Sequence, residues 1–184
     1  MPIESPGRDE PSAWVRRFAA LIPPRGRVLD LACGKGRHAR FLAALGHVVE
    51  AVDRDAEALA GLRDIAGIAV RQADLEGGPW PYFGRAFDGI VVSRYLHRPL
   101  MPNLIGALAE GGVLIYETFM LGNERFGKPD DPAYLLRMGE LLDLFGKRFK
   151  VVAFEQGEVD SPRPAVIQRI CVHRGSRFRL PVSA

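Results

Sequence analysis

The stretch Val28-Leu29-Asp30-Leu31-Ala32-Cys33-Gly34-Lys35-Gly36-Arg37-His38 decides the fold of this chain. Its first four residues have the apolar pattern of a buried strand, and a helix begins near Arg37. Gly34 and Gly36 let the backbone between them turn sharply and approach a ligand without a Cβ in the way. Because the amides that open the helix carry partial positive charge, we predict that a polar, partly anionic ligand lies against this turn, as a nucleotide cofactor does.

The spacing Gly34-x-Gly36-x-x-Ala39 also satisfies the dinucleotide-binding fingerprint G-x-G-x-x-G/A. Asp30 argues against a dinucleotide, because its carboxylate ends the first strand close to where a pyrophosphate would lie, and like charges repel. A ligand that carries an ammonium and a sulfonium would be attracted instead. S-adenosylmethionine carries both, so the sequence favours it as the cofactor.

The chain resembles the class I S-adenosylmethionine-dependent methyltransferases, and among them the tellurite-resistance and thiopurine-type branch that acts on small molecules. The similar residues are Gly34-Lys35-Gly36-Arg37-His38, Leu42-Ala43-Ala44-Leu45-Gly46-His47 and Val52-Asp53. The resemblance runs from about Trp14 to Val172 and is strongest up to Asp53. It implies S-adenosylmethionine as the cofactor and methyl transfer to a small molecule. Ala32 departs from the pattern, because the family usually has a glycine there.

Apolar runs and helical periodicities alternate along the chain. Strands are predicted at 28–31, 47–53, 69–74, 87–93 and 113–117, and helices after Ser12, after Arg37, around 59–65, around 104–108 and from Asp131 to Gly146. Such alternation is typical of an α/β fold with a parallel sheet between two layers of helices. The resemblance implies the same fold, a Rossmann-like doubly wound sheet of seven strands.

The last two predicted strands, 151–154 and 165–172, depart from this alternation. About ten residues separate them, including Pro162 and Pro164, which leaves no room for a parallel crossover. We therefore predict an antiparallel C-terminal hairpin. The class I methyltransferase sheet ends with such a strand, so the resemblance agrees with the spacing.

The length of 184 residues fits one domain, which we place at 12–174 between tails at 1–11 and 175–184. No apolar run approaches the roughly 20 residues of a membrane span, and the first residues carry acids and prolines instead of an apolar signal core. We expect no membrane association and a cytoplasmic location. Cys33 and Cys171 form no disulfide framework and have no metal-ligand spacing, so no metal is expected.

The charge balance gives only a mild preference for an anionic partner. The chain has 25 basic and 22 acidic residues and an isoelectric point near 9.1, which solvated surface arginines also explain. Nucleic acid is not expected, because no dense basic stripe is present. The family's base-modifying members have a proline-containing run after the fourth strand, where this chain reads Ser93-Arg94-Tyr95-Leu96. The pattern does not indicate an oligomeric state.

Acidic residues end the first three predicted strands, where parallel sheets bind ligands. We assign Asp30 to the methionyl amino group, Asp53 to the ribose hydroxyls and Asp74 to the adenine amino group, with Leu75 packing on the ring. Asp53 lies 19 residues after Gly34, close to the usual offset of the ribose-binding acid. The alternative is that these acids cap turns or helices, as Asp55 is positioned to do.

The rest of the predicted cofactor site surrounds these acids. Arg37 either binds the cofactor's carboxylate through its fork of donors or is an exposed arginine of the first helical turn. Cys33 is interpreted as a packing residue. The remaining predicted contacts are Ala32, Gly34, Gly36, Arg54 and Ser93.

Methyl transfer is a displacement from an already activated sulfonium, so orientation alone can suffice. If the acceptor must lose a proton, the candidate bases are Tyr95, His97 and Glu117, just beyond the fourth and fifth strands. His97 is equally consistent with a surface loop histidine. The segments 80–85 and 118–129 are either substrate lids or ordinary loops, and their aromatic and arginine content suggests an apolar or anionic small molecule.

Two other functions remain open at this level. A nicotinamide-dependent oxidoreductase fits the glycine spacing and Asp53, but it is opposed by Asp30 and by the lack of room for a substrate domain. A catalytically silent cofactor-binding protein on the same scaffold also fits, because methyl transfer requires no particular activating side chain. Turnover is what separates this silent protein from a methyltransferase.

Overall fold

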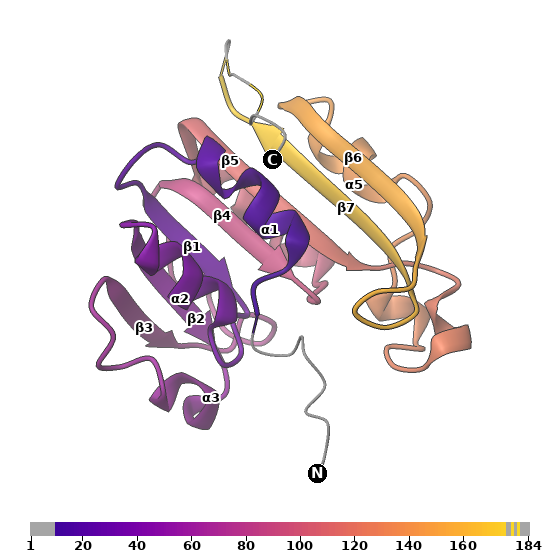
Figure 1. The fold of residues 1–184 in the computed structure, drawn as a ribbon, viewed down its shortest axis with the longest axis horizontal. Coiled ribbons are helices and arrows are strands. Elements are labelled where there is room, and N and C mark those ends of the chain that lie inside the picture. The colour runs from indigo at the N-terminus through magenta and orange to yellow at the C-terminus, as the bar shows by residue number, and fades with distance from the viewer. Residues whose placement is uncertain (1–9, 176–177, 179, 181–184) are drawn as a thin grey trace.

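The computed structural model describes residues 10–175, 178 and 180. In this part of the chain seven strands form one sheet in the order β3-β2-β1-β4-β5-β7-β6 (Figure 1). The strands are β1 (Arg27–Leu31), β2 (Val48–Asp53), β3 (Ile68–Gln72), β4 (Phe87–Ser93), β5 (Leu108–Phe119), β6 (Lys150–Val159) and β7 (Ala165–His173). The first five are parallel, and β7 is antiparallel to both β5 and β6. The predicted seven-stranded sheet and its C-terminal hairpin are confirmed.

The order of the strands reverses at β1, which pairs with β2 on one side and with β4 on the other. The carboxyl ends of the parallel strands point to one edge of the sheet, and the turn between β6 and β7 lies at the same edge (Figure 1). Open α/β sheets bind ligands at such a reversal, beyond the carboxyl ends of the strands. The topology therefore brings the turns that follow the parallel strands and the turn between β6 and β7 to one edge of the sheet.

Three short helices cover one face of the sheet: α1 (Ala13–Phe18), α2 (Arg37–Ala44) and α3 (Ala56–Ala60). In Figure 1, α1 and α2 lie in front of the strands. Their apolar residues, such as Trp14, Leu42 and Leu59, form one core cluster with strand residues such as Val49 and Ile115. Each helix is too short to be stable alone, so this packing holds it in place.

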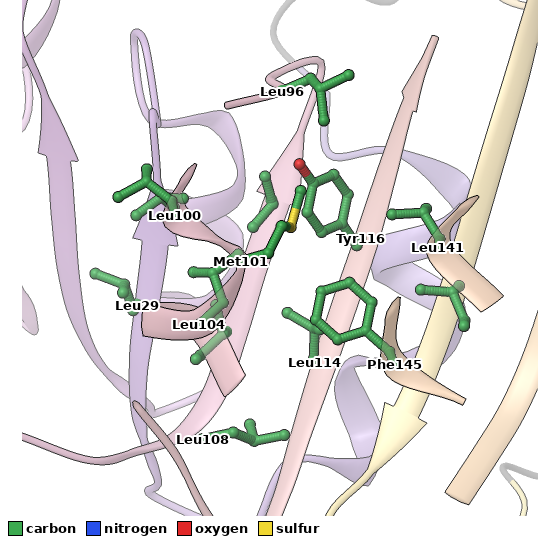
Figure 2. Packing of buried hydrophobic residues seen from close by; sticks show 14 of the residues in the cluster. Leu29, Leu96, Leu100, Met101, Leu104, Leu108, Leu114, Tyr116, Leu141 and Phe145 are labelled. Atoms are coloured by element: carbon green, nitrogen blue, oxygen red, sulfur yellow. The ribbon is translucent and has the colours of Figure 1, made fainter. Parts of the chain in front are cut away.

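The other face is covered by α4 (Met101–Ala107) and α5 (Glu140–Phe145). Figure 2 shows Met101 of α4 and Phe145 of α5 beside Tyr116 of β5. The rings of Tyr116 and Phe145 lie 6.2 Å apart between centroids. The sheet thus has a packed core on both faces, as the doubly wound fold predicts.

The predicted helix from Asp131 to Gly146 is wrong. Only a 3-10 turn at Pro132–Tyr134 and the helix α5 form there, and Leu136 between them makes an isolated β-bridge to Met120. Gly139 has a φ of 71°, which begins α5 with a left-handed residue. The buried leucines that suggested a helical face therefore belong partly to an extended segment.

The regular alternation of strands and helices also fails between β3 and β4. Residues 73–86 contain turns and no helix. Tyr82 fills the place that a helix would cover, since it is 1% exposed and meets the Phe87 ring edge-on with centroids 5.4 Å apart. This contact anchors the segment 80–85 to the core through Tyr82. The other segment proposed as a lid, 118–129, begins inside β5, and its Asn123 is buried.

Most of the two predicted tails, at 1–11 and 175–184, lies outside the described residues. Within the described part, no helix combines the length and apolar character needed to cross a membrane. Cys33 and Cys171 are both free and buried.

Candidate active site

The glycine turn between β1 and α2 is held in an unusual backbone conformation. Ala32, Gly34 and Gly36 all have positive φ angles, at 51°, 54° and 75°. A Cβ on Gly36 would lie 2.4 Å from Cδ1 of Leu62, whereas a Cβ on Gly34 would meet no described atom within 4 Å. Gly36 is therefore required by packing, and the open side of Gly34 leaves room for a ligand.

Asp53, at the end of β2, holds this turn. Its Oδ2 accepts a hydrogen bond from the Gly34 amide at 2.8 Å, and its Oδ1 accepts one from the Asp55 amide at 3.0 Å. Asp55 caps α3 by accepting from the Glu57 and Ala58 amides. The capping role expected for Asp55 is confirmed, and Asp53 remains partly exposed beside the turn.

A pocket of about 270 Å³ opens beside Asp53 at the carboxyl ends of the strands. We call it the acidic pocket, because three of its charged residues are acids and two are arginines. Asp74 lies two residues beyond β3, and the amides of Glu76 and Gly77 lower its pKa, so that it remains an ionised acceptor. The lining residues are Ala32, Asp53, Arg54, Ala73, Asp74, Leu75, Glu76, Arg94 and Tyr95.

The Tyr95 hydroxyl is a polar group that needs a partner in this pocket. Its oxygen is buried and makes no hydrogen bond of ordinary geometry with a described residue, although the Glu76 carboxylate lies close enough to raise its pKa further. Burial raises the pKa of this hydroxyl, so it stays protonated and can both donate and accept. A buried hydroxyl without a partner is costly, which makes a polar ligand at this wall favourable.

Asp30 does not line this pocket. It is 1% exposed, and its Oδ2 accepts a hydrogen bond from the Ala39 amide at 2.9 Å, in the first turn of α2. Burial raises its pKa to about 7, although that hydrogen bond and the nearby Arg37 charge oppose the rise. Asp30 therefore stabilises the start of α2 beneath the turn. Its contact with a cofactor amino group stays a prediction.

A series of hydrogen bonds links α2, β4 and β5 through Arg37, Ser93 and Glu117. Arg37 donates to Ser93 Oγ at 3.2 Å, and Ser93 Oγ donates to Glu117 Oε1 at 3.3 Å. Arg37 also donates to the Glu10 carbonyl oxygen at 3.2 Å. Arg37 is thus partly buried and held in place, in contrast to the exposed arginine that the sequence left open.

A second pocket, of about 300 Å³, lies beside this series of hydrogen bonds and is lined by its two ends, Arg37 and Glu117. We call it the arginine pocket, because its walls include Arg16, Arg37, Arg94, Arg163 and Arg169. Its remaining lining residues are Glu10, Pro11, Ser12, Ala13, Glu117, Thr118, Phe119, Val159, Ser161, Pro162, Ala165 and Ile167. Arg94 lines both pockets, so the two adjoin.

The segment at 10–16 is fixed against α2 by His38. The Ser12 amide donates to His38 Nε2 at 3.2 Å. Burial lowers the pKa of His38 to about 3, so this imidazole is neutral and can accept. This contact places Glu10 and Arg16 at the wall of the arginine pocket.

The candidate bases fall in different places. Tyr95 lies in the acidic pocket and Glu117 in the arginine pocket, while His97 lines neither and begins the 3-10 turn at Arg98–Leu100. Leu75 is buried at the pocket wall, and Cys33 is buried with its pKa raised by desolvation, in keeping with a packing role. The predicted residues thus divide between two adjoining pockets.

Of the arginines that line the second pocket, the sequence pointed to Arg37 and not to Arg16, Arg94, Arg163 or Arg169. Arg94 directly follows β4 and has a positive φ of 55°, so its place after a strand end is a signal that could have found it. Arg163 lies between two prolines in the turn after β6, and no sequence pattern links it to Arg37. Only the fold brings these two together.

The chain matches the family model described as a methyltransferase domain over residues 28–112, somewhat less than half of its length. The similarity to this family is therefore limited to residues 28–112. The matched part contains every lining residue of the acidic pocket, but only Arg37 and Arg94 from the arginine pocket. The domain family therefore covers the predicted cofactor half of the site.

A curated protein is also similar to part of this chain. The chain is 35% identical over 111 residues to the protein-L-isoaspartate O-methyltransferase of Chlorobaculum tepidum, in a match that covers 55% of this chain and 49% of that protein. It spans about half the length of this curated relative.

Solved structures show the same fold. TehB from Haemophilus influenzae superposes with a TM-score of 0.73 at 20% identity, over 89% of this chain and 62% of that one. An S-adenosylmethionine-dependent methyltransferase from Mesorhizobium loti superposes with a TM-score of 0.66 at 20% identity, over 89% and 99%. The predicted fold is thus confirmed.

Proposed function

We propose that this chain is an S-adenosylmethionine-dependent methyltransferase that acts on a small molecule. The observation that carries the proposal is the acidic pocket, which adjoins the glycine turn of a methyltransferase domain. Its excess of carboxylates suits a ligand with hydroxyls, an amino group and a positive charge, and repels a diphosphate. This charge balance disfavours a nicotinamide cofactor.

The residues of the acidic pocket fit the parts of S-adenosylmethionine. Each carboxylate oxygen of Asp53 has further capacity to accept after its backbone hydrogen bond, so Asp53 can receive the ribose hydroxyls. Asp74 can receive the adenine amino group while Leu75 packs on the ring. The Tyr95 hydroxyl gains the partner that it lacks among the described residues.

The other predicted contacts complete this arrangement. Gly34 leaves one side of the turn open, Gly36 lets the turn pack against Leu62, and Ala32 and Arg54 form the adjoining wall. Arg37 faces the boundary with the arginine pocket, where its guanidinium can hold the carboxylate of the methionyl group. Ser93 orients Arg37, and Asp30 supports the helix from below.

The contribution of this chain to the reaction is positioning. When bound, S-adenosylmethionine would supply an electrophilic methyl group on a cationic sulfur, so that an acceptor lone pair could bond to the methyl carbon as the carbon–sulfur electron pair returns to sulfur. Holding the acceptor in line with that bond provides much of the rate. Glu117 lines the acceptor side, where its carboxylate can take a proton from an acceptor that must lose one.

The arginine pocket has the size of a small-molecule site. Its volume of about 300 Å³ is at the lower end of the range for small ligands, and it adjoins the acidic pocket at Arg94. We therefore assign the acceptor to the arginine pocket. A small molecule with its reacting atom near Arg94 would face the cofactor.

Calorimetry with S-adenosylhomocysteine and with NADH tests the cofactor. We expect the chain to bind S-adenosylhomocysteine and not NADH. Binding of NADH alone would overturn the proposal.

Transfer of a labelled methyl group to a panel of metabolites then tests the activity. We expect at least one labelled product. Cofactor binding without any methyl transfer across a broad panel would favour the silent cofactor-binding protein instead.

A further inference from the structure

The charged residues of the arginine pocket have an excess of positive charge. Its walls hold five arginines and two glutamates, Glu10 and Glu117. The adjoining acidic pocket has the opposite balance. Two pockets of opposite charge at one edge of the sheet point to two ligands of different charge.

Part of this positive charge is not paired with a carboxylate. Arg163 forms no ion pair with any residue that the structure describes. Arg37 donates its hydrogen bonds to two uncharged oxygens, the Ser93 hydroxyl and the Glu10 carbonyl, although the Glu117 carboxylate lies near enough to interact with its charge. Arg16 pairs with Glu10 at 3.3 Å, but both side chains are exposed, so this pair is weak. Arg16 can therefore exchange Glu10 for a ligand at small cost.

Arg169 has a different environment. Its Nε donates to Glu155 at 2.9 Å, and its guanidinium lies 4.7 Å from the centroid of the buried Trp14 ring. These contacts fix Arg169 as part of the wall. The arginines available to a ligand are thus Arg16, Arg37 and Arg163.

The same pocket has an apolar surface. Phe119 and Ala165 are buried at its walls, and Ile167 lies beside them. This surface can pack against a hydrocarbon chain or an aromatic ring. A fully solvated inorganic ion would leave it uncovered.

The arginines at the hairpin lie far from the glycine turn. Three strand intervals separate β1 from β7, which at the usual spacing between strands is about 14 Å. An anionic group held by Arg163 would therefore lie on the hairpin side of the pocket. The other end of the same molecule would reach Arg94, at the boundary with the acidic pocket.

We propose that the methyl acceptor is an organic anion with an apolar body, whose carboxylate or phosphate is bound by Arg163 and Arg16 in the arginine pocket. This inference rests on the proposed function, because it names the acceptor class of the same site. The anionic group anchors the molecule, and the apolar body directs a nucleophilic atom toward the cofactor. Its specificity comes from residues outside the matched methyltransferase domain.

Calorimetry with matched acids and amides tests the charge requirement. The probes are benzoate and hexanoate, each compared with benzamide or hexanamide, in the presence of saturating S-adenosylhomocysteine. Each acid is expected to bind at least about tenfold more tightly than its amide, because a charged group gains stronger hydrogen bonds from arginine. Equal affinity for acid and amide, including no binding of either, would overturn the proposal.

The double variant Arg16→Gln/Arg163→Gln then tests the residues. We expect the affinity for benzoate to fall about tenfold or more while the affinity for S-adenosylhomocysteine is unchanged, and Arg163→Lys to retain most of the acid preference. The matched control is Arg125→Gln, since Arg125 is an exposed arginine outside both pockets that pairs with Glu158.

The affinities for S-adenosylhomocysteine and for benzoate together show whether Arg16 and Arg163 bind the carboxylate of the cofactor or that of the acceptor. A double variant that loses S-adenosylhomocysteine and not benzoate would show that these arginines bind the cofactor's carboxylate, which contradicts the proposal. Failure of the unaltered chain to bind S-adenosylhomocysteine would contradict the proposed function instead.

Discussion

The acidic pocket and the arginine pocket adjoin at Arg94 but differ in charge and in origin. The acidic pocket has three acids and two arginines, all from one continuous part of the chain that matches the methyltransferase domain. The arginine pocket has five arginines and two acids, mostly from the segments 10–16, 117–119 and 159–169 outside that match. We therefore assign the cofactor to the part that matches the family model, and the acceptor to a pocket built mostly outside that match.

The two pockets also depend on different supports. The acidic pocket is built on backbone: a turn with positive φ angles whose amide is held by Asp53. The arginine pocket is built on side chains that meet only after the terminal hairpin and the segment at 10–16 have packed. Changes in the turn should therefore affect cofactor binding or stability and leave the acid preference of the arginine pocket intact.

The largest effect is expected for Gly36→Ala. The new Cβ would collide with Leu62 at 2.4 Å, and alanine would keep the strained φ of 75°. Together these should lower the free energy of unfolding by about 3 kcal/mol. Denaturant unfolding measures the loss.

Gly34→Ala is the matched control for that variant. It shares the positive φ but meets no described atom within 4 Å, so it should cost only about 1 kcal/mol of stability. Its Cβ instead occupies the open side of the turn and should weaken S-adenosylhomocysteine binding. If both glycine variants lose the same stability, Leu62 does not constrain the turn as described.

The next effect concerns the pH dependence of stability through Asp30, which lies beneath the turn. Its pKa is about 7 in the fold and near 3.8 without burial, so the folded state holds a proton that the unfolded state has released. The free energy of unfolding should therefore fall as pH rises from about 4 to about 7, by at most about 1.4 kcal/mol per pH unit. Asp30→Asn cannot ionise and can still accept from the Ala39 amide.

Unfolding at pH 5 and at pH 8 tests this expectation. The stability of Asp30→Asn relative to the unaltered protein should increase between these pH values by about 2 kcal/mol. Taking the difference between the two proteins removes the contribution of other titrating groups. Parallel pH profiles would show that Asp30 is not protonated in the fold at pH 5 to 7.

The sequence predicted the acidic pocket better than the arginine pocket, for a physical reason. Strand ends and glycine turns follow from local patterns, so Asp53, Asp74 and Gly34 could be placed at one edge before the fold was known. The burial of Asp30 depends on how α2 packs, which no local pattern reports. The arginine pocket joins residues more than one hundred positions apart, so only the sheet order reveals it.

The errors in secondary structure have a similar cause. Leu135 lies seven residues before Leu142, which is the spacing of a helical face. Leu135 and Leu136 are nevertheless buried in an extended segment, because Leu136 pairs with Met120. Between β3 and β4 the chain covers the core with Tyr82 instead of a helix. In both places a tertiary contact overrides the local preference of the sequence.

A smaller effect, on binding, is expected for Asp53→Ala. Loss of hydrogen bonds between this carboxylate and the ribose should weaken S-adenosylhomocysteine binding by about 2 kcal/mol, or roughly 30-fold. Calorimetry measures this change, and the acid preference of the arginine pocket should persist.

Asp55→Ala is the matched control, two residues along the same loop. Asp55 caps α3, so its loss should cost about 1 kcal/mol of stability and leave the affinity for S-adenosylhomocysteine nearly unchanged. An Asp53→Ala variant that binds as tightly as Asp55→Ala would remove Asp53 from the cofactor site.

The smallest effect is expected for Ala32→Gly, at the wall of the acidic pocket. Ala32 has a φ of 51°, which costs an alanine about 1 kcal/mol and a glycine nothing. Glycine loses more conformational entropy on folding and would remove the alanine methyl group that packs against the core, so the gain should stay below about 1 kcal/mol. Thermal and denaturant unfolding measure it. A loss of stability would mean that the methyl contact outweighs the backbone strain, and that this chain departs from the family's usual glycine because its turn is packed differently.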